Sequence, residues 1–597
     1  MYLLVTVWAL ANPYSLGDFF GAYFVVFWGL SSILFCLIVS FYGLVPWLIK
    51  KVFGPLVKAQ QTAFEIQQQA HPNVVLSRPL LLQLSESQLV QPPHPVSLPV
   101  FLLAVLISWL VDTDNHEVRR VYLKEQVSYA YADFSEAWKT FSINLSKSDL
   151  YLKPSTNETE QRVRKKPVFF VASQGGGLRA AYWSAVGMGY LEARIPGFSQ
   201  HVFSLAGVSG GSVGNSFYAA SLNQPVVQNQ CLALTKDLHL ACGLEHALGT
   251  DYLSPVLTSF LYNDLLYRFF PLSSLPFMVR DRAEVLETSW EKGFARVFSS
   301  NNMQAKLQSL YQSDDDNWLP LLMSMGAHQE SGTRLVTAPF PIEQDIFINQ
   351  YNTYDLMACD NGIGINCDMR LSTVALNAAR FPFVTPAGTL AKKSENGSNI
   401  PWKEKDHIID GGYVENYGLM ATRFMISHLM ANNQFSVVEN GQSIELVPVV
   451  IIFANDMDLT TEVFNPSRKR PYRNGNSLAL NEVTNPLQGL LTTRSGRSVQ
   501  SLTELIDFQH RLGGKQIATQ ITFPDAGSNE APVIMNNVVV FHLQNDASNV
   551  NVPLGWWLSD QSQTYMSDQY RTQGKRAHQA IESLSRVIKT SSNAESP

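Results

Sequence analysis

The sequence has little charge and no excess of basic residues: 16% of its 597 residues are charged, and the formal net charge is −6. This balance argues against a general nucleic-acid-binding protein, so no nucleic-acid partner is expected. The chain also lacks a fixed-period repeat and a long low-complexity tract. Hydrophobic residues make up 46% of it and aromatic residues 11%, which is typical of a folded protein. Only the C-terminal stretch 586–597, which ends in TSSNAESP, is expected to be disordered.

Cysteine is scarce as well, with five in the whole chain. Apart from Cys36 they form two close sets, Cys231 with Cys242 and Cys359 with Cys367. No Cys-x-x-Cys or histidine-rich spacing indicates zinc, and no metal or other cofactor is expected. An even number of cysteines is compatible with disulfide bonds in an exported domain, for which local pairing within each set is the most natural connectivity. Four ordinary buried thiols are the alternative.

Charge is entirely absent from Phe19 to Ile49. A helix needs about 20 apolar residues to cross a bilayer core, so this stretch predicts a transmembrane helix at about 19–49. No basic segment precedes it, which makes a cleaved signal peptide a poor fit. A second candidate span, at about 92–111, is shorter and contains Pro99, and a buried helix of the remaining chain is its alternative. Residues 1–112 are therefore predicted to be a membrane region.

The basic residues near the first candidate span predict an orientation. No Lys or Arg precedes it, whereas Lys50, Lys51 and Lys58 follow it closely. The positive-inside rule places that end in the cytoplasm. A second span would then carry the rest of the chain, including any catalytic domain, to the extracytoplasmic or periplasmic side.

The chain after the membrane region has the pattern of an α/β domain. Residues 113–165 are polar and mixed, which predicts a linker. Between 166 and 585, short apolar runs alternate with helical patterns, as in a domain built on a mainly parallel sheet. Residues 230–350 interrupt this alternation with an aromatic, helical pattern, and they are expected to form an insertion or cap over a site.

Within this domain, residues Gly207 to Gly211 match the pattern G-x-S-x-G. In a nucleophile elbow the serine lies on a sharp turn between a strand and a helix, and the glycines allow the neighbouring backbone to come close. An apolar run precedes the motif and small residues follow it, which is the required context. Ser209 is therefore the candidate nucleophile, and a purely structural turn is the alternative.

A serine nucleophile needs a base. The late histidines lie in no recognisable loop signature, whereas the segment IIDGGYVENYG places Asp410 at the end of an apolar run, before two glycines. An aspartate in such a tight, partly desolvated turn could accept the serine proton directly. The alternative is an Asp-Gly turn that holds its own backbone.

Three consecutive glycines, Gly175, Gly176 and Gly177, follow another apolar run in FFVASQGGGLRAAYW. Glycine before a helix indicates that the backbone itself must come close to something. The segment is compatible with a tight turn, with a phosphate cradle, or with an oxyanion hole made of backbone N–H groups.

Together, GGG-x-R, G-x-S-x-G and D-G-G in this order resemble the patatin-like phospholipase superfamily, including its cytosolic phospholipase A branch. The segment STVALNAARFPFVTPAG (372–388) also resembles the helix and turn that lead to the catalytic aspartate in that family. The sequence departs from plant patatins at Gln174, where they have an acidic residue. The resemblance covers about residues 165–425 and none of the membrane region.

The resemblance implies a three-layer α/β fold with a helical cap, preceded here by transmembrane helices. It also implies a Ser209–Asp410 dyad without histidine, an oxyanion hole from Gly175, Gly176 and Gly177, and a position for Arg179 near the mouth, where it would contact a phosphate headgroup or act as a structural cap. The expected function is that of a membrane-anchored phospholipase A or lysophospholipase, with a membrane lipid as substrate and the bilayer as partner. The alternatives are an α/β-hydrolase-type esterase with an unrecognised histidine and a catalytically dead, membrane-tethered binding module.

Overall fold

The computed structural model divides the chain into two compact units, one of residues 1–115 and 254–282 and the other of residues 116–253 and 283–597. Apart from a few isolated positions, the structure describes residues 11–70, 116–153, 164–265, 281–312, 317–357, 365–381, 384–390, 406–439, 441–455, 537–544 and 552–590.

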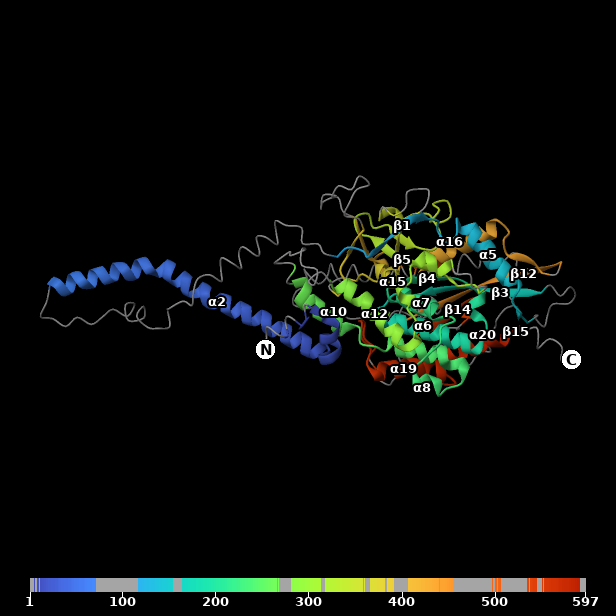
Figure 1. The fold of residues 1–597 in the computed structure, drawn as a ribbon, viewed down its shortest axis with the longest axis horizontal. Helices are drawn as coiled ribbons and strands as arrows, with labels where there is room; N and C mark the ends of the chain where they lie inside the picture. Colours follow the sequence, from blue (N-terminus) through green and yellow to red (C-terminus); the bar gives the residue numbers. More distant parts are fainter. Residues whose placement is uncertain are drawn as a thin grey trace. The chain divides into compact units, whose positions relative to one another are not determined.

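The first unit consists mainly of one long helix, α2 (Pro13–Ala70) (Figure 1). Its backbone departs from helical geometry at Gly21. The short helix α10 (Leu253–Thr258) and the π-helical turn η4 (Ser259–Asp264) belong to the same unit, and Tyr262 of this turn packs against the apolar side chains of α2.

The expected membrane span at about 19–49 lies within α2. In the part of the chain that the structure describes, no helix combines the length and the apolar character needed to cross a membrane, so the structure gives this expectation no support. The second expected span, at about 92–111, lies outside the described residues.

The second unit is built on a central sheet whose middle five strands are parallel, in the order β14-β12-β3-β4-β5. Nearly every residue of these strands is buried, as expected where helices cover both faces of a sheet. Their bounds are β3 (Lys165–Ser173), β4 (Val202–Val208), β5 (Leu321–His328), β12 (Gln442–Ala454) and β14 (Val538–His542).

Shorter strands extend this sheet, and most of them pair antiparallel to their neighbours. They are β6 (Arg334–Thr337), β7 (Gln350–Asn352), β9 (Gly388–Thr389), β10 (His407–Asp410), β11 (Ser436–Glu439) and β13 (Ile534–Met535). Two small antiparallel pairs lie apart from it: β1 (Arg120–Val127) with β8 (Ile365–Met369), and β2 (Leu150–Leu152) with β15 (Ile588–Thr590). The fold is mixed α/β with a mainly parallel central sheet, and this part of the predicted fold class is confirmed.

Helices cover both faces of the sheet (Figure 1). On one face, α5 and α16 join an aromatic core in which the rings of Trp138 and Phe203 meet at 5.0 Å. On the other face α6 and α7 follow β3 and β4 and pack closely, because Gly214 leaves no side chain between them.

The bounds of the helices are α5 (Phe134–Ser146), α6 (Gly177–Arg194), α7 (Gly210–Ser221), α8 (Asn229–Leu232), α9 (His239–Leu248), α12 (Arg282–Phe298), α13 (Leu307–Tyr311), α14 (Thr353–Leu356), α15 (Leu371–Ala378), α16 (Leu419–Ala431), α19 (Asp560–Arg571) and α20 (Arg576–Val587), with 3₁₀ turns η2 (Phe198–His201), η3 (Lys236–Leu238), η5 (Asn302–Gln304) and η7 (Gly411–Tyr413).

Two predicted boundaries differ from the structure. The expected linker, 113–165, contains β1 and α5, and α5 buries five apolar side chains in the core. The described residues of the expected helical insertion, 230–350, are mainly helical as far as α13, but residues 321–328 form β5 of the central sheet. The sequence of β5, LLMSMGAH, has no alternation of apolar and polar residues, and its Leu, Met and Ala residues also suit a helix.

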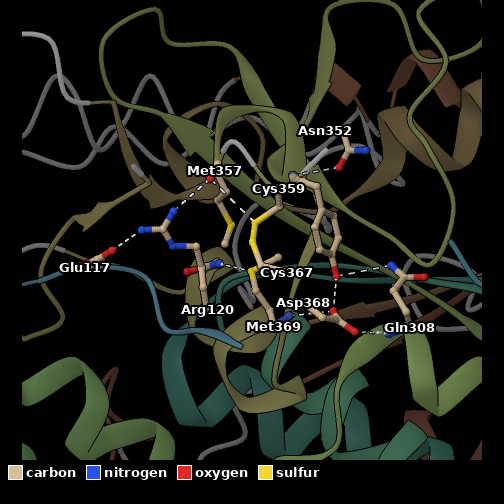
Figure 2. The surroundings of a disulfide bond; sticks show 11 residues. Glu117, Arg120, Gln308, Asn352, Met357, Cys359, Cys367, Asp368 and Met369 are labelled. Carbon is tan, nitrogen blue, oxygen red and sulfur yellow. Dashed lines mark hydrogen bonds and ion pairs between the residues drawn. A yellow bond between two sulfur atoms is a disulfide. The ribbon is translucent and has the colours of Figure 1, made fainter. Parts of the chain in front are cut away.

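The four late cysteines are paired within their sets. Cys231–Cys242 joins α8 to α9, with the two Cα atoms 5.5 Å apart. Cys359–Cys367 lies beside the buried Asp368, whose carboxylate accepts hydrogen bonds from the Tyr354 hydroxyl at 2.6 Å and the Gln308 N–H at 3.1 Å (Figure 2). This is the local pairing that the sequence favours.

Candidate active site

Ser209 lies at the turn between β4 and α7, with backbone angles φ 51° and ψ −129°. A positive φ is uncommon for a residue other than glycine and indicates a strained turn that its surroundings impose. The glycines on either side are required, because a Cβ on Gly210 would collide with the Gly177 carbonyl and a Cβ on Gly207 with the backbone of Ser212. The strand, turn and helix of a nucleophile elbow are therefore all present.

Ser209 and Asp410 are brought together by the strand register. Val208 of β4 pairs with Met325 of β5, and Asp410 of β10 pairs with the next residue, Gly326. Because β6 pairs with the opposite edge of β5 at Met325 and Gly326, β4 and β10 meet end to end on the same edge. There the Ser209 Oγ donates to Asp410 Oδ2 at 2.6 Å.

The aspartate is fully buried and held in place by backbone groups. Its second oxygen, Oδ1, accepts a hydrogen bond from the Gly412 N–H at 2.7 Å, and its own N–H donates to the Arg380 carbonyl at 3.1 Å. On the serine side, the Ser209 N–H donates to the Ala378 carbonyl at the end of α15 at 3.1 Å. Both members of the pair are therefore fixed before any substrate binds.

The glycine segment lies beside the serine, since a Cβ on Gly175 would come within 2.8 Å of the Ser209 Cβ. The three expected oxyanion donors are not equivalent. The Gly175 N–H donates to the Asn416 carbonyl at 2.9 Å and so already has an acceptor. The N–H groups of Gly176 and Gly177 have no acceptor among the described residues, and both glycines have positive φ (157° and 60°). The geometry therefore favours Gly176 and Gly177 as the donors and does not favour Gly175.

Arg179 lies close to this segment, but its guanidinium is bound within the protein. Its Nε and Nη2 donate to the Asn455 Oδ1 at 3.0 and 2.9 Å, and its Nη1 donates to the Val552 carbonyl at 3.1 Å. These contacts match the structural alternative for Arg179 rather than the headgroup contact.

Asn455, which follows the last residue of β12, was not predicted as a site residue from the sequence. Its Nδ2 donates to the Gly175 carbonyl at 3.0 Å, and its backbone N–H donates to the Gln174 Oε1 at 2.6 Å. An amide directly after a buried parallel strand, in VVIIFAND, lies at the edge where the other site residues meet, and this position is the signal that could have found it.

Glu415 is a second residue that the sequence did not single out. It is buried in the loop after Asp410, and its carboxylate accepts hydrogen bonds from the N–H groups of Tyr417 and Gly418 at 2.7 and 2.8 Å. Burial raises the pKa of Glu415, although these hydrogen bonds and Arg334 act in the opposite direction. The loop also carries Asn416, so Glu415 helps to hold the carbonyl that binds Gly175.

Three of the late histidines have other partners. His407 is bound to Glu330, His428 to Asn432, and His578 to the Tyr570 carbonyl. His510 lies outside the described residues. The partner that the structure gives to the Ser209 Oγ is a carboxylate.

No family model and no curated protein matches the sequence. Among solved structures, human GIVD cytosolic phospholipase A2 is similar over 76% of this chain and 64% of its own length, at 12% sequence identity and a TM-score of 0.28. At that score the likeness shows nothing about the activity of this chain.

Proposed function

We propose that the protein is a serine acyl hydrolase that cleaves carboxylic esters of phospholipids or lysophospholipids through a Ser209–Asp410 dyad. The observation that carries the proposal is the 2.6 Å hydrogen bond from the Ser209 Oγ to the Asp410 Oδ2 at the end of a strained strand–helix turn. The Gly412 N–H on the other carboxylate oxygen keeps Oδ2 directed at the serine.

The reaction follows from these positions. Ser209 attacks the ester carbonyl while Asp410 takes the hydroxyl proton, and the N–H groups of Gly176 and Gly177 face the oxygen that becomes negative. The protonated Asp410 then gives its proton to the leaving alcohol as the acyl-enzyme forms. In the second half, Asp410 takes a proton from water and the resulting hydroxide attacks the carbonyl carbon of the acyl ester. The bond from that carbon to the Ser209 Oγ then breaks, the carboxylic acid leaves, and Asp410 returns its proton to the Ser209 Oγ.

The buried setting of the dyad supports this role. Asp410 is fully buried and Ser209 is 5% exposed, so little water screens the charges that develop. The donors and the base are fixed by backbone hydrogen bonds, so they need little reorganisation when the charge appears. Asn455, which Arg179 orients, holds the glycine segment in that arrangement.

A lipid acyl group as substrate is supported by exposed apolar side chains near the dyad and by the sequence resemblance. Phe381, 38% exposed, stacks on Tyr413 and follows Arg380, whose carbonyl accepts the Asp410 N–H. On the side of the glycine segment, Leu554 is 67% exposed and precedes Gly555, whose carbonyl accepts the N–H of the residue after Gly177.

Membrane anchoring and an extracytoplasmic location are a further part of the proposal. They rest on the N-terminal charge pattern, and the Cys231–Cys242 and Cys359–Cys367 pairs support them because disulfide bonds persist mainly in oxidising compartments. Reporter fusions after residue 120, of the kind that are active on only one side of a membrane, test this part. Activity of the cytoplasmic reporter alone would contradict it.

The catalytic proposal is tested by labelling the full-length protein with a fluorophosphonate probe, which reacts with an activated serine of any esterase. Ser209→Ala is expected to abolish labelling. Ser221→Ala is the matched control, because its hydroxyl binds a carbonyl of its own helix α7. No labelling of the wild type would favour the binding module. Loss of labelling on replacing His428, His542 or His578 with Gln would favour a histidine-dependent esterase.

A further inference from the structure

A second group of polar side chains, outside the dyad, gathers where β5 ends and β10 begins. It consists of His328, Glu330, Asp406 and His407. One ligand atom from each of the first three lies within 4.8 Å of the others. The dyad makes no use of these groups.

The imidazole of His328 lies between the two carboxylates. Its Nε2 is 2.9 Å from the Asp406 Oδ1 and 3.2 Å from the Glu330 Oε2. Its other ring nitrogen, Nδ1, is 2.7 Å from the Ser331 hydroxyl, which in turn contacts the Thr333 hydroxyl at 2.7 Å. A histidine that binds a metal through one nitrogen is usually held by a hydrogen bond at the other, and His328 has this arrangement.

The backbone that carries these side chains is held by the sheet. Ile408 pairs with His328 in the antiparallel register of β10 and β5, and the Gln329 N–H donates to the His407 carbonyl at 2.9 Å. The Asp406 carbonyl accepts the Leu390 N–H at 2.9 Å. The side chains are thus fixed on strands and their immediate ends, as a precise binding site requires.

The charge of the group favours a cation. Among the described residues, all ion pairs of Glu330 and Asp406 are with histidine, and none is with Lys or Arg. With neutral imidazoles the group carries two negative charges within a few ångströms. A cation bound among the side chains would offset their repulsion.

We propose that this group is a site for a divalent transition metal of the Zn²⁺ type, bound by the His328 Nε2, one oxygen of Glu330 and one of Asp406, with water completing the coordination. Nitrogen and carboxylate oxygen at about 2.0–2.2 Å are ordinary zinc ligands, and they lie about 3.3 Å apart in a tetrahedral shell. The present separations of 2.9 and 3.2 Å need only a small expansion when the metal replaces the proton on Nε2.

His407 acts on this site through Glu330. Its Nδ1 lies 2.7 Å from the Glu330 Oε1, and its backbone N–H donates to Oε2 at 3.0 Å. Outer hydrogen bonds of this kind orient a ligating carboxylate. Because the metal would link the end of β5 to the start of β10, it would brace the strand that ends at Asp410, and its main effect would be on stability.

The full-length protein, dialysed against a chelator and kept free of reductant so that Cys231 and Cys242 stay paired, is titrated with Zn²⁺ by calorimetry and by thermal unfolding. One Zn²⁺ per chain and a raised Tm are expected. His328→Gln and Asp406→Asn should each weaken binding at least tenfold and remove the Tm shift, and His407→Gln should weaken it less.

His246→Gln is the matched control, because His246 is near Cys231 and Cys242 in the other group of candidate metal ligands. It should leave Zn²⁺ binding unchanged, and X-ray absorption should show nitrogen and oxygen but no sulfur around the metal. Far-UV circular dichroism of each variant reports whether it has folded, independently of any catalytic activity. The proposal is overturned if the wild type binds no Zn²⁺, if binding survives both ligand variants, or if the His246 variant abolishes it.

Discussion

Strand β10 has an aspartate at each end, and the two carboxylates lie in different surroundings. Asp410, its last residue, is fully buried and accepts hydrogen bonds from Ser209 and the Gly412 N–H. Asp406, just before its first residue, is 43% exposed, and its partner is the His328 imidazole. The buried carboxylate is fixed by hydrogen-bond donors of the protein itself. At the exposed carboxylate, solvent or a cation can replace the histidine as its partner.

This difference predicts at which end of β10 the loss of a single hydrogen-bond partner has the larger effect. At the buried end each hydrogen bond is made in a low-dielectric setting, and losing one partner leaves the other without compensation. At the exposed end water compensates for a lost partner. The substitutions below test whether the buried end behaves as one fixed unit, and they run from the largest expected effect to the smallest.

The largest effect is expected from removing either member of the dyad. Ser209→Ala and Asp410→Asn should each lower kcat for ester hydrolysis by about 10³-fold or more, because the two groups act on the same proton. The double variant should be no slower than either single one. Steady-state kinetics on a short-chain ester measures this, and a double variant that is much slower would mean that the two residues act independently.

A smaller loss is expected from the glycine segment. Gly176 has φ 157°, and a side chain there would collide with the Asn455 amide. Gly176→Val should displace the N–H donors and lower kcat by about 10²- to 10³-fold with little change in KM, since the donors bind the transition state.

Gly197→Ala is the matched control for backbone strain. Gly197 also has positive φ (81°), but a Cβ there meets nothing within 4 Å. This control should cost roughly 1 kcal/mol of stability and leave kcat unchanged. An unchanged kcat in Gly176→Val would assign the glycines a structural role only.

Arg179→Lys distinguishes two roles for this residue. A lysine cannot reproduce the forked contacts with the Asn455 Oδ1 and the Val552 carbonyl, so the segment should shift and kcat should fall by roughly tenfold on both a phospholipid and a neutral ester. A rise in KM for the phospholipid alone would instead identify Arg179 as a headgroup contact.

The smallest effect concerns Glu192, a carboxylate of α6 outside the dyad. Burial raises its pKa to about 7, although hydrogen bonds from Ser199 and Tyr218 act against the rise. The folded protein therefore holds a proton that the unfolded chain loses near pH 4.5, and the free energy of unfolding should decrease as pH rises from about 4.5 to about 7.

Glu192→Gln should remove this decrease, because an amide does not ionise. Urea unfolding of the wild type and the variant at several pH values between 4.5 and 8 measures the effect. Glu582→Gln is the control, since Glu582 pairs with an exposed arginine at the surface and should not change the slope. Equal slopes for the wild type and Glu192→Gln would mean that folding does not raise the pKa of Glu192.

The parts of the site that were predictable from the sequence are those whose signal is local. The strand, sharp turn and helix around Ser209 follow from Gly207 and Gly210, and the position of Asp410 follows from an apolar run that ends in two glycines. The structure places the two side chains within hydrogen-bond distance, while their catalytic roles stay predictions.

The parts that could not be predicted depend on contacts distant in sequence. The acceptor for the Gly175 N–H belongs to Asn416, and the partners of Arg179 are Asn455 and Val552. No local pattern in the sequence shows which backbone N–H groups of the glycine segment lack an acceptor. Nor does it show that the Arg179 guanidinium is already hydrogen-bonded within the protein. In the fold, α5 was not predicted from the sequence, because only one of its faces is apolar and the stretch around it is polar and mixed.

The site is also a reporter of completed folding. Its contacts join Ser209 to Asp410, Gly175 to Asn416, and Arg179 to both Asn455 and Val552, so each bridges more than 200 residues of chain. Contacts of such long range form late, because the loop between them must first close. A chain released before β12 has emerged contains every residue of the dyad and still lacks the amide that holds the glycine segment. We therefore expect Ser209 to react with a probe only after β12 and the segment around Val552 have joined the fold.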